Sequence, residues 1–296
     1  MKLRHSWPST TARWLSVTLL AFLLANVGAA RAGAAELAPV ARLHVGLVPE
    51  ELGKGTTIEF GFTITGAGGG VPPPLTRIEL RYPDHIGIVT SGLGIASCTQ
   101  VVLEEEGVIG CPSRSLMGYG EATGEAVLDG ELLEESGQTA IFMAPLANER
   151  INLEFYVNGE TPLEDQLIFP GVLTTASPPY GGDLVITVPL LPALREGPDI
   201  ALARLHSTIG PLGVTYYERV HREFVPYRPS GIILPPSCPL GGFPFAVSFA
   251  FANGTNTTSH DYVRCPDAHA GYKRHERAPR RQRGRGSTRF TQRRWR

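Results

Sequence analysis

The sequence predicts an all-β protein, an antiparallel β-sandwich stapled by disulfides, with one short helix near residues 98–106. Three observations predict this fold. Apolar and polar residues alternate in several short segments, Gly and Pro cluster between these segments, and four cysteines follow an export-type N-terminus. Many short alternating segments separated by turn residues are typical of β-sandwiches.

The first 32 residues have the layout of a secretory signal peptide. Three cations in the first 13 residues precede an apolar run over residues 14–30, and a small-x-small tripeptide ends at Ala32. This order predicts cleavage after Ala32, with Ala34 as the alternative site. An uncleaved membrane anchor is the other interpretation, but a run of about 17 residues is at the lower limit for a spanning helix. No later stretch approaches 18 apolar residues, so we expect a secreted or cell-surface protein with no transmembrane helix after cleavage.

The strands are predicted from period-two alternation, which gives a half-buried strand one apolar and one polar face. The alternating segments are residues 57–64, 77–82, 151–157 and 243–251. Asn158-Gly159 and Asn253-Gly254 predict tight turns after the last two segments. We expect a main β-sandwich region over residues 33–228 and a C-terminal hairpin unit over residues 229–268, either separate or part of the same sandwich.

The single helix is predicted from its end signals. Ser97 followed by Gln100 fits a capping box, and Gly107 fits the residue that ends a helix. The alternative for this stretch is a short strand over residues 101–103.

The cysteines are predicted to form disulfides. An even number of cysteines in an exported chain favours a disulfide framework, and four cysteines allow three pairings. The sequential pairing closes the shortest loops, so we predict Cys98–Cys111 and Cys238–Cys265. The spacings contain no C-x2-C pair, so neither a zinc site nor a thioredoxin-type redox centre is indicated.

No catalytic or cofactor-binding motif is present. The glycines at Gly118, Gly120 and Gly124 do not have the spacing of a nucleotide-binding loop and are interpreted as glycines packed in a bulged or tight strand. A G-x-S-x-G elbow and an H-E-x-x-H zinc motif are also missing. We therefore predict no catalytic residues, no cofactor and no metal site.

Acidic residues concentrate between residues 104 and 135. A solvated acidic face is the preferred interpretation, and two others stay open: a carbohydrate-binding or carbohydrate-active site that also uses surface tyrosines, and a calcium site. The acidic residues are Glu104, Glu105, Glu106, Glu121, Glu125, Asp129, Glu131, Glu134 and Glu135. The tyrosines are Tyr216, Tyr217, Tyr227 and Tyr262.

Charge is divided along the chain. Residues 273–296 contain eleven Lys and Arg and one Glu, a net charge of +10, whereas residues 33–272 carry −15. Residues 269–296 are therefore predicted to be a disordered basic tail that binds an anionic envelope polymer or surface through charge, without recognising a specific nucleic acid. The arginines assigned to this polyanion binding are Arg280, Arg281, Arg283, Arg285, Arg293, Arg294 and Arg296.

Both cysteine segments resemble elements of uncharacterised exported β-rich proteins of high-GC actinobacteria. The resemblance covers about 50 residues. The matching positions are Cys98, Cys111, Pro112, Ser115, Gly118 and Gly120 in the first segment, and Cys238, Pro239, Gly242, Phe243, Gly254, Cys265 and Pro266 in the second. It implies a disulfide-stapled extracellular β fold and no catalytic activity. A bacterial source also agrees with the excess of Arg over Lys, 24 to 3.

These observations predict an exported, non-enzymatic protein of the cell surface or its surroundings, with a basic tail that tethers it. They leave the ligand and the oligomeric state open.

Overall fold

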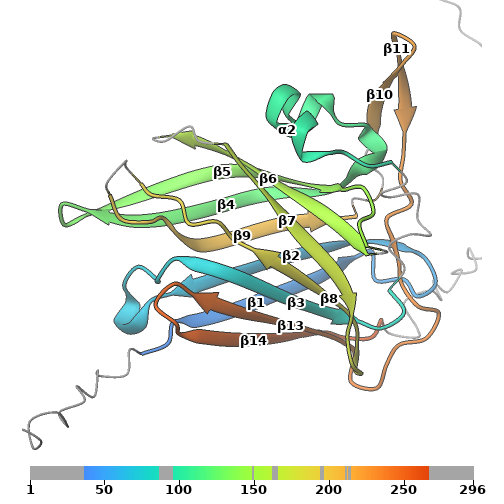
Figure 1. The fold of residues 1–296 in the computed structure, drawn as a ribbon. Coiled ribbons are helices and arrows are strands. Elements are labelled where there is room, and N and C mark those ends of the chain that lie inside the picture. The colour runs from blue at the N-terminus through green and yellow to red at the C-terminus, as the bar shows by residue number, and fades with distance from the viewer. Residues whose placement is uncertain are drawn as a thin grey trace, which may run out of the picture.

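The computed structural model describes residues 37–86, 96–148, 150–161, 166–193, 197–210, 212 and 215–266. Within these residues the chain is mostly antiparallel β-strand, with one short α-helix and two disulfides, as the sequence predicts (Figure 1). The predicted signal peptide and basic tail lie outside the described residues.

One large sheet dominates the molecule. Eleven of its twelve strands form a continuous path, and the twelfth, β12 (Ile232–Ile233), pairs with β2. The order along the path is β1 (Val40–Val48), β2 (Gly55–Thr65), β9 (Ala201–Ile209), β4 (Leu116–Leu128), β5 (Glu131–Met143), β6 (Ile151–Thr161), β7 (Gln166–Thr175), β8 (Tyr180–Thr187), β3 (Leu75–Pro83), β13 (Phe243–Phe251) and β14 (Asn256–Val263). A separate hairpin consists of β10 (Tyr216–Val220) and β11 (Glu223–Tyr227).

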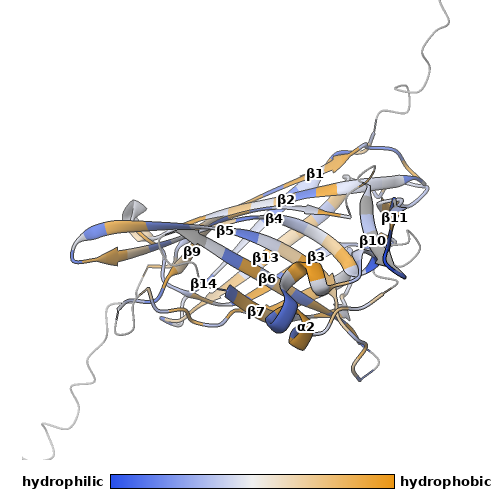
Figure 2. Cartoon of the chain, turned by 90° about the horizontal axis from the view of Figure 1, so that it is seen from above, coloured by the Kyte–Doolittle hydropathy of each residue, from blue (hydrophilic) through white to orange (hydrophobic). Residues whose placement is uncertain are grey.

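The large sheet curls until its two edge strands, β1 and β14, lie side by side (Figure 1). The two facing layers expected of a β-sandwich are therefore formed here by a single curled sheet. Period-two alternation directs one set of side chains into the interior, as on β13, where Phe243, Phe245, Val247, Phe249 and Phe251 are all buried. The β4–β5 hairpin extends beyond its neighbours at one end of the molecule (Figures 1 and 2).

The seam between β1 and β14 is closed by side chains. Neighbours along the eleven-strand path are antiparallel, so the first and last strands run in the same direction. No backbone ladder joins them among the described residues. Instead, the backbone N–H of Leu43 donates to Ser259 Oγ (2.9 Å), and the backbone N–H of Val45 donates to Asp261 Oδ2 (2.7 Å). Ser259 and Asp261, on the inward face of β14, thus satisfy two N–H groups at the free edge of β1.

Aromatic packing fills the interior next to the seam. The rings of Phe62 on β2 and Phe249 on β13 meet edge to face, with their centroids 4.8 Å apart. Phe60 packs against Phe62 in a similar way, at 6.2 Å. The contact between Phe62 and Phe249 joins two strands that are far apart in the order of the sheet, so it stabilises the curled sheet from inside.

The predicted helix is present, but its cap differs from the prediction. Helix α2 spans Gln100–Glu106, and its N-cap is Thr99, whose hydroxyl accepts from the N–H of Val102. The predicted cap, Ser97, is wrong, because Thr99 is the residue at the helix boundary with extended backbone angles. Gly107 ends the helix at φ 67°, as predicted. Three short 3₁₀ turns are η2 (Ala67–Gly69), η4 (Gly107–Gly110) and η5 (Ser113–Ser115).

The two predicted disulfides are confirmed, as is the turn at Gly254 (φ 82°) after β13. The predicted turn at Asn158-Gly159 is wrong, because β6 continues through both residues to Thr161. Asn158 pairs with Gln138 on β5 and Gln166 on β7, and Gly159 pairs with Gly137. Hydrogen bonding to strands on both sides outweighs the local turn preference.

The seam predicts an effect on stability. Asp261→Ala removes the acceptor for the Val45 N–H, and we expect a loss of about 1–3 kcal/mol in the free energy of unfolding, because that N–H then lacks its partner. Asp261→Asn keeps an oxygen acceptor and should cost less. Denaturant unfolding measures both. Thr258→Ala, on the outer face of the same strand, is the matched control, and equal losses for Asp261→Ala and Thr258→Ala would contradict the role of the seam.

Candidate functional site

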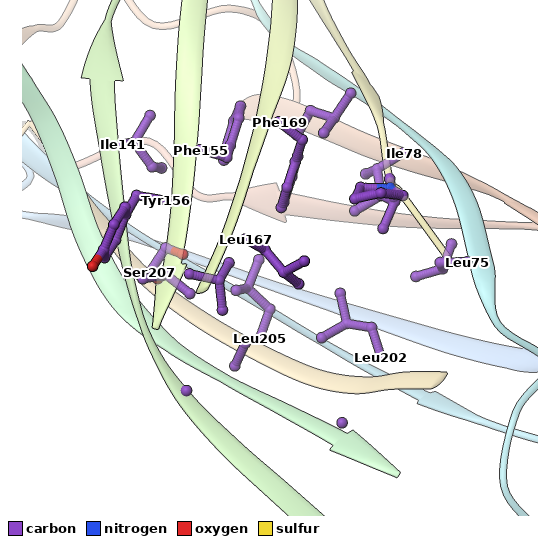
Figure 3. A pocket seen from close by; sticks show the side chains of 18 of the residues that line it. Leu75, Ile78, Ile141, Phe155, Tyr156, Leu167, Phe169, Leu202, Leu205 and Ser207 are labelled. Atoms are coloured by element: carbon purple, nitrogen blue, oxygen red, sulfur yellow. The ribbon is translucent and has the colours of Figure 1, made fainter. Parts of the chain in front are cut away.

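A cavity of about 170 Å³ lies inside the curled sheet, and strands β2 to β9 all contribute to its lining. Its wall is almost wholly apolar (Figure 3). Phe155 on β6 and Phe169 on β7 form one side, with their rings stacked at 5.7 Å and tilted by only 6°. Leu202 and Leu205 on β9 form part of the opposite side. The volume is close to the roughly 150 Å³ of an apolar protein cavity that binds benzene.

The cavity exists because small residues occupy inward positions on three adjacent strands. Ala122 on β4 pairs with Gly137 on β5, which pairs with Gly159 on β6, and all three line the cavity. Larger residues at these positions would fill the interior as the phenylalanines do near the seam. The side chains of Phe155 and Phe169 therefore border open space rather than another packed layer.

Few polar side chains line this apolar wall. Thr139 on β5 and Ser207 on β9 contribute hydroxyl groups, and Glu135 lies nearer the β4–β5 turn. Thr139 Oγ1 is buried and has no hydrogen-bond partner among the described residues. Among the described residues, the lining includes no Lys, Arg, His, Cys or Asp. An ionic ligand would therefore lack a cationic partner in the cavity, whereas a neutral apolar ligand fits it.

The first disulfide segment supports the cavity wall from outside. Helix α2 packs on the outer face of β5, β6 and β7, where Leu103 and Phe142 are buried with Cys98. The backbone N–H of Cys98 donates to the carbonyl of Met143 (2.8 Å), and the side chain of Gln166 donates to the carbonyl of Leu103 (3.1 Å). These contacts fix the strands whose inner faces carry Phe155 and Phe169.

One carboxylate lies on the outer face beside α2. Burial raises the pKa of the Glu154 carboxyl, and the negative charge of Glu104 on the helix raises it further. Glu154 lies next to Phe155 in the strand and so faces away from the cavity. It is part of the outer packing and contacts no cavity ligand.

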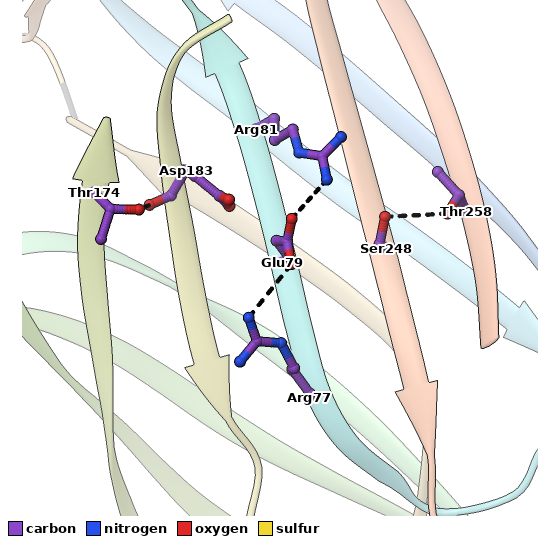
Figure 4. A network of polar contacts seen from close by, with 7 residues as sticks. All are labelled: Arg77, Glu79, Arg81, Thr174, Asp183, Ser248 and Thr258. Atoms are coloured by element: carbon purple, nitrogen blue, oxygen red, sulfur yellow. Dashed lines mark hydrogen bonds and ion pairs between the residues drawn. The ribbon is translucent and has the colours of Figure 1, made fainter. Parts of the chain in front are cut away.

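A second polar cluster lies on the outer face of β3 and β8 (Figure 4). Glu79 accepts hydrogen bonds from Arg81 (2.6 Å) and Arg77 (3.4 Å), and the bond from Arg81 is the main cause of a lowered pKa of Glu79. Asp183, opposite Arg81 in the ladder, has its pKa raised to about 6 by burial and by the charge of Glu79. No cavity-lining residue belongs to this cluster, which is a surface charge network.

The acidic residues singled out in the sequence are not gathered into one cleft. Glu104, Glu105 and Glu106 lie on α2, and the others lie on the β4–β5 hairpin. Glu125 and Glu134 face each other in the ladder, but the next pair, Gly124 and Glu135, lines the cavity, so the Glu125–Glu134 pair points outward. Within the part of the chain that the structure describes, no three His, Cys, Asp or Glu residues are arranged to hold a metal ion.

The remaining predicted residues lie away from the cavity or outside the described residues. Tyr217 on β10 and Tyr262 on β14 are exposed, and neither lines the cavity. The seven tail arginines lie outside the described residues, and their polyanion binding stays a prediction. The glycine-rich stretch of β4 contains two register shifts, near Gly118 and Gly124, in agreement with its interpretation as a bulged strand.

The sequence interpretation missed the cavity itself. Its signal is present in the small residues at inward positions of β4, β5 and β6, but their alignment across strands depends on register. No helix among the described residues is long and apolar enough to cross a membrane. No family model, curated protein or solved structure matches the chain.

The surface cluster predicts a pH-dependent effect of Asp183→Asn. The pKa of Asp183 is raised on folding, so its ionised form destabilises the protein above about pH 6, and this cost disappears as the pH falls below its unfolded value near 4. Asp183→Asn should therefore raise Tm by a few degrees at pH 7.5 and by much less at pH 4. Thermal unfolding at both pH values measures the difference. An equal rise at both would show that charge is not the cause.

Proposed function

We propose that this protein is an exported, non-enzymatic binding protein that holds a small apolar ligand inside its curled sheet. The observation that carries the proposal is the cavity of about 170 Å³ lined almost only by apolar side chains. Protein interiors are normally packed to the density of organic crystals. A cavity of this size inside the curled sheet is therefore unusual for a packed interior, and ligand binding accounts for it.

The energetics favour an occupant. A ligand that fills the cavity recovers dispersion contacts with Phe155 and Phe169 and removes its own apolar surface from water.

The chemistry of the lining supports binding rather than catalysis. A hydrolytic site needs a nucleophile beside a general base, and no histidine or cysteine is among the described residues that line the cavity. Glu135 is the single carboxylate of these lining residues. Export is supported by the engagement of all four cysteines in disulfides, a usage typical of oxidising compartments.

The cavity is tested with toluene as the probe and Ala122→Leu as the variant. Toluene should raise the Tm of the unmodified protein, because a ligand that binds only the native state stabilises it. Leucine at position 122 projects into the cavity, so we expect the variant to lose most of this shift while its own Tm stays equal or rises. Thermal unfolding with and without toluene, together with titration calorimetry, measures both effects.

Ala250→Leu is the matched control, because it adds the same atoms to the outer face of β13, between the inward-facing Phe249 and Phe251. It should keep the full toluene shift. A failure of toluene and other small apolar probes to bind the unmodified protein would contradict the proposed function.

The proposal includes the basic C-terminal segment as a tether to anionic envelope polymers or surfaces. Deleting residues 273–296 removes ten net positive charges and should release the protein from the envelope fraction into the medium. Fractionation of cells that express the full and the shortened chain measures this. Unchanged retention would contradict the tether and leave the cavity proposal standing.

A further inference from the structure

We propose that the ligand of the cavity is a neutral molecule with an apolar body and one hydroxyl group, and that Thr139 binds this hydroxyl. The inference rests on the proposed function, since it names the chemical class of the ligand for the same cavity. It is carried by the buried hydroxyl of Thr139, which has no hydrogen-bond partner among the described residues and lies in an almost wholly apolar wall.

Thr139 and Ser207 lie in one row of the sheet. Gly120 on β4 pairs with Thr139 on β5 on one side and with Ser207 on β9 on the other. Neighbouring strands are about 4.8 Å apart, so the two residues lie about 10 Å apart across the sheet. Ser207 lies among the apolar side chains of the cavity wall, close to Leu205 (Figure 3).

The residue between the two hydroxyls has no side chain. A Cβ at Gly120 would lie 2.1 Å from the carbonyl oxygen of His206, so close approach of β4 to β9 requires glycine here. No side chain therefore separates Thr139 from Ser207. A ligand group lying over Gly120 can approach the hydroxyl of Thr139, whereas Ser207 is too far away to bind the same group.

The hydroxyl of Thr139 needs a partner. Its oxygen is buried and has no hydrogen-bond partner among the described residues, an unfavourable arrangement in an apolar environment. Its inward neighbours in the ladder are Gly120 and Val157, which offer no polar side chain. A well-held water needs two to four polar partners, which this part of the wall does not provide. A hydroxyl carried into the cavity by a ligand supplies the bond together with its own apolar contacts.

The lining also selects against charged ligands. Among its described residues it contains no cationic side chain, so a carboxylate or phosphate would lose its hydration without gaining a counter-charge from them. Glu135, the only charged side chain of the described lining, adds to this selection against anions and already interacts within the protein. Among neutral groups, a hydroxyl both donates to and accepts from the hydroxyl of Thr139.

The test compares phenol with toluene, two rings with the same number of heavy atoms that differ by the hydroxyl. Thr139→Val removes the hydroxyl of the protein and keeps the shape of the side chain. We expect the variant to bind phenol about threefold to tenfold more weakly, the usual effect of one hydrogen bond, and to bind toluene as before. Ser207→Ala removes a hydroxyl about 10 Å away across the sheet and should leave phenol binding unchanged. Titration calorimetry on the full chain with both disulfides formed measures each Kd.

Thr174→Val is the matched control, because Thr174 lies on the outer face of β7 and donates to the carbonyl of Asp183. It should change neither Kd. Benzoate, which has the same ring with a carboxylate, should bind far more weakly than phenol to every variant. Benzoate binding as tight as that of phenol would overturn the selection for a neutral ligand.

The outcomes separate the two proposals. If toluene and phenol bind but Thr139→Val weakens neither, or weakens both equally, the hydroxyl-binding role is overturned and the cavity function stands. If neither ring binds the unmodified protein, the cavity function itself fails. The Tm without ligand gives an independent readout: Thr139→Val should leave it equal or raise it, because a buried hydroxyl without a partner is removed. A clear fall in Tm would mean that this hydroxyl has a partner in the unliganded protein and would overturn the inference.

Discussion

The structure depends on closing a curled sheet whose two edge strands cannot continue its antiparallel order. Eleven strands with antiparallel neighbours leave β1 and β14 running in the same direction. Ser259 and Asp261 replace a backbone ladder by accepting two N–H groups of β1. Because these acceptors are side chains, the inward face of β14 is polar at Ser259 and Asp261, where the inward face of β13 is apolar.

The size of the inward residues then decides what the enclosed space contains. Phenylalanines of β2 and β13 fill the part next to the seam, with Phe62 and Phe249 in direct ring contact. On the other side, Ala122 and Gly137 leave the cavity open in front of Phe155 and Phe169. The stapled segment with α2 packs behind these strands, so the Cys98–Cys111 disulfide contributes to the rigidity of the cavity wall as well as to the fold.

Local sequence signals predicted the strand-rich class, four of the strands and the helix, and they failed where pairing partners outweighed them. The alternation at 57–64 and 243–251 found β2 and β13 because a half-buried strand repeats every two residues. The sequential disulfide pairing was predicted because it closes the shortest loops, and the structure has this pairing. Asn158-Gly159 has the residues of a tight turn, but β5 and β7 on either side hold it in a strand. The helix cap is Thr99 and not the predicted Ser97, and a difference of two residues is ordinary for predicted helix ends.

The amino-acid sequence by itself determined the strand-rich fold, the disulfide pairing and the division of charge, because each depends on residues that are near one another along the chain. The cavity, its hydroxyl row and the seam were decided only by the tertiary structure. Thr139, Gly120 and Ser207 come from three strands, and Ser207 is 68 residues beyond Thr139 in the sequence. Which side chains share an enclosed space depends on strand order and register across the whole sheet, and both are set by long-range pairing that no local pattern encodes.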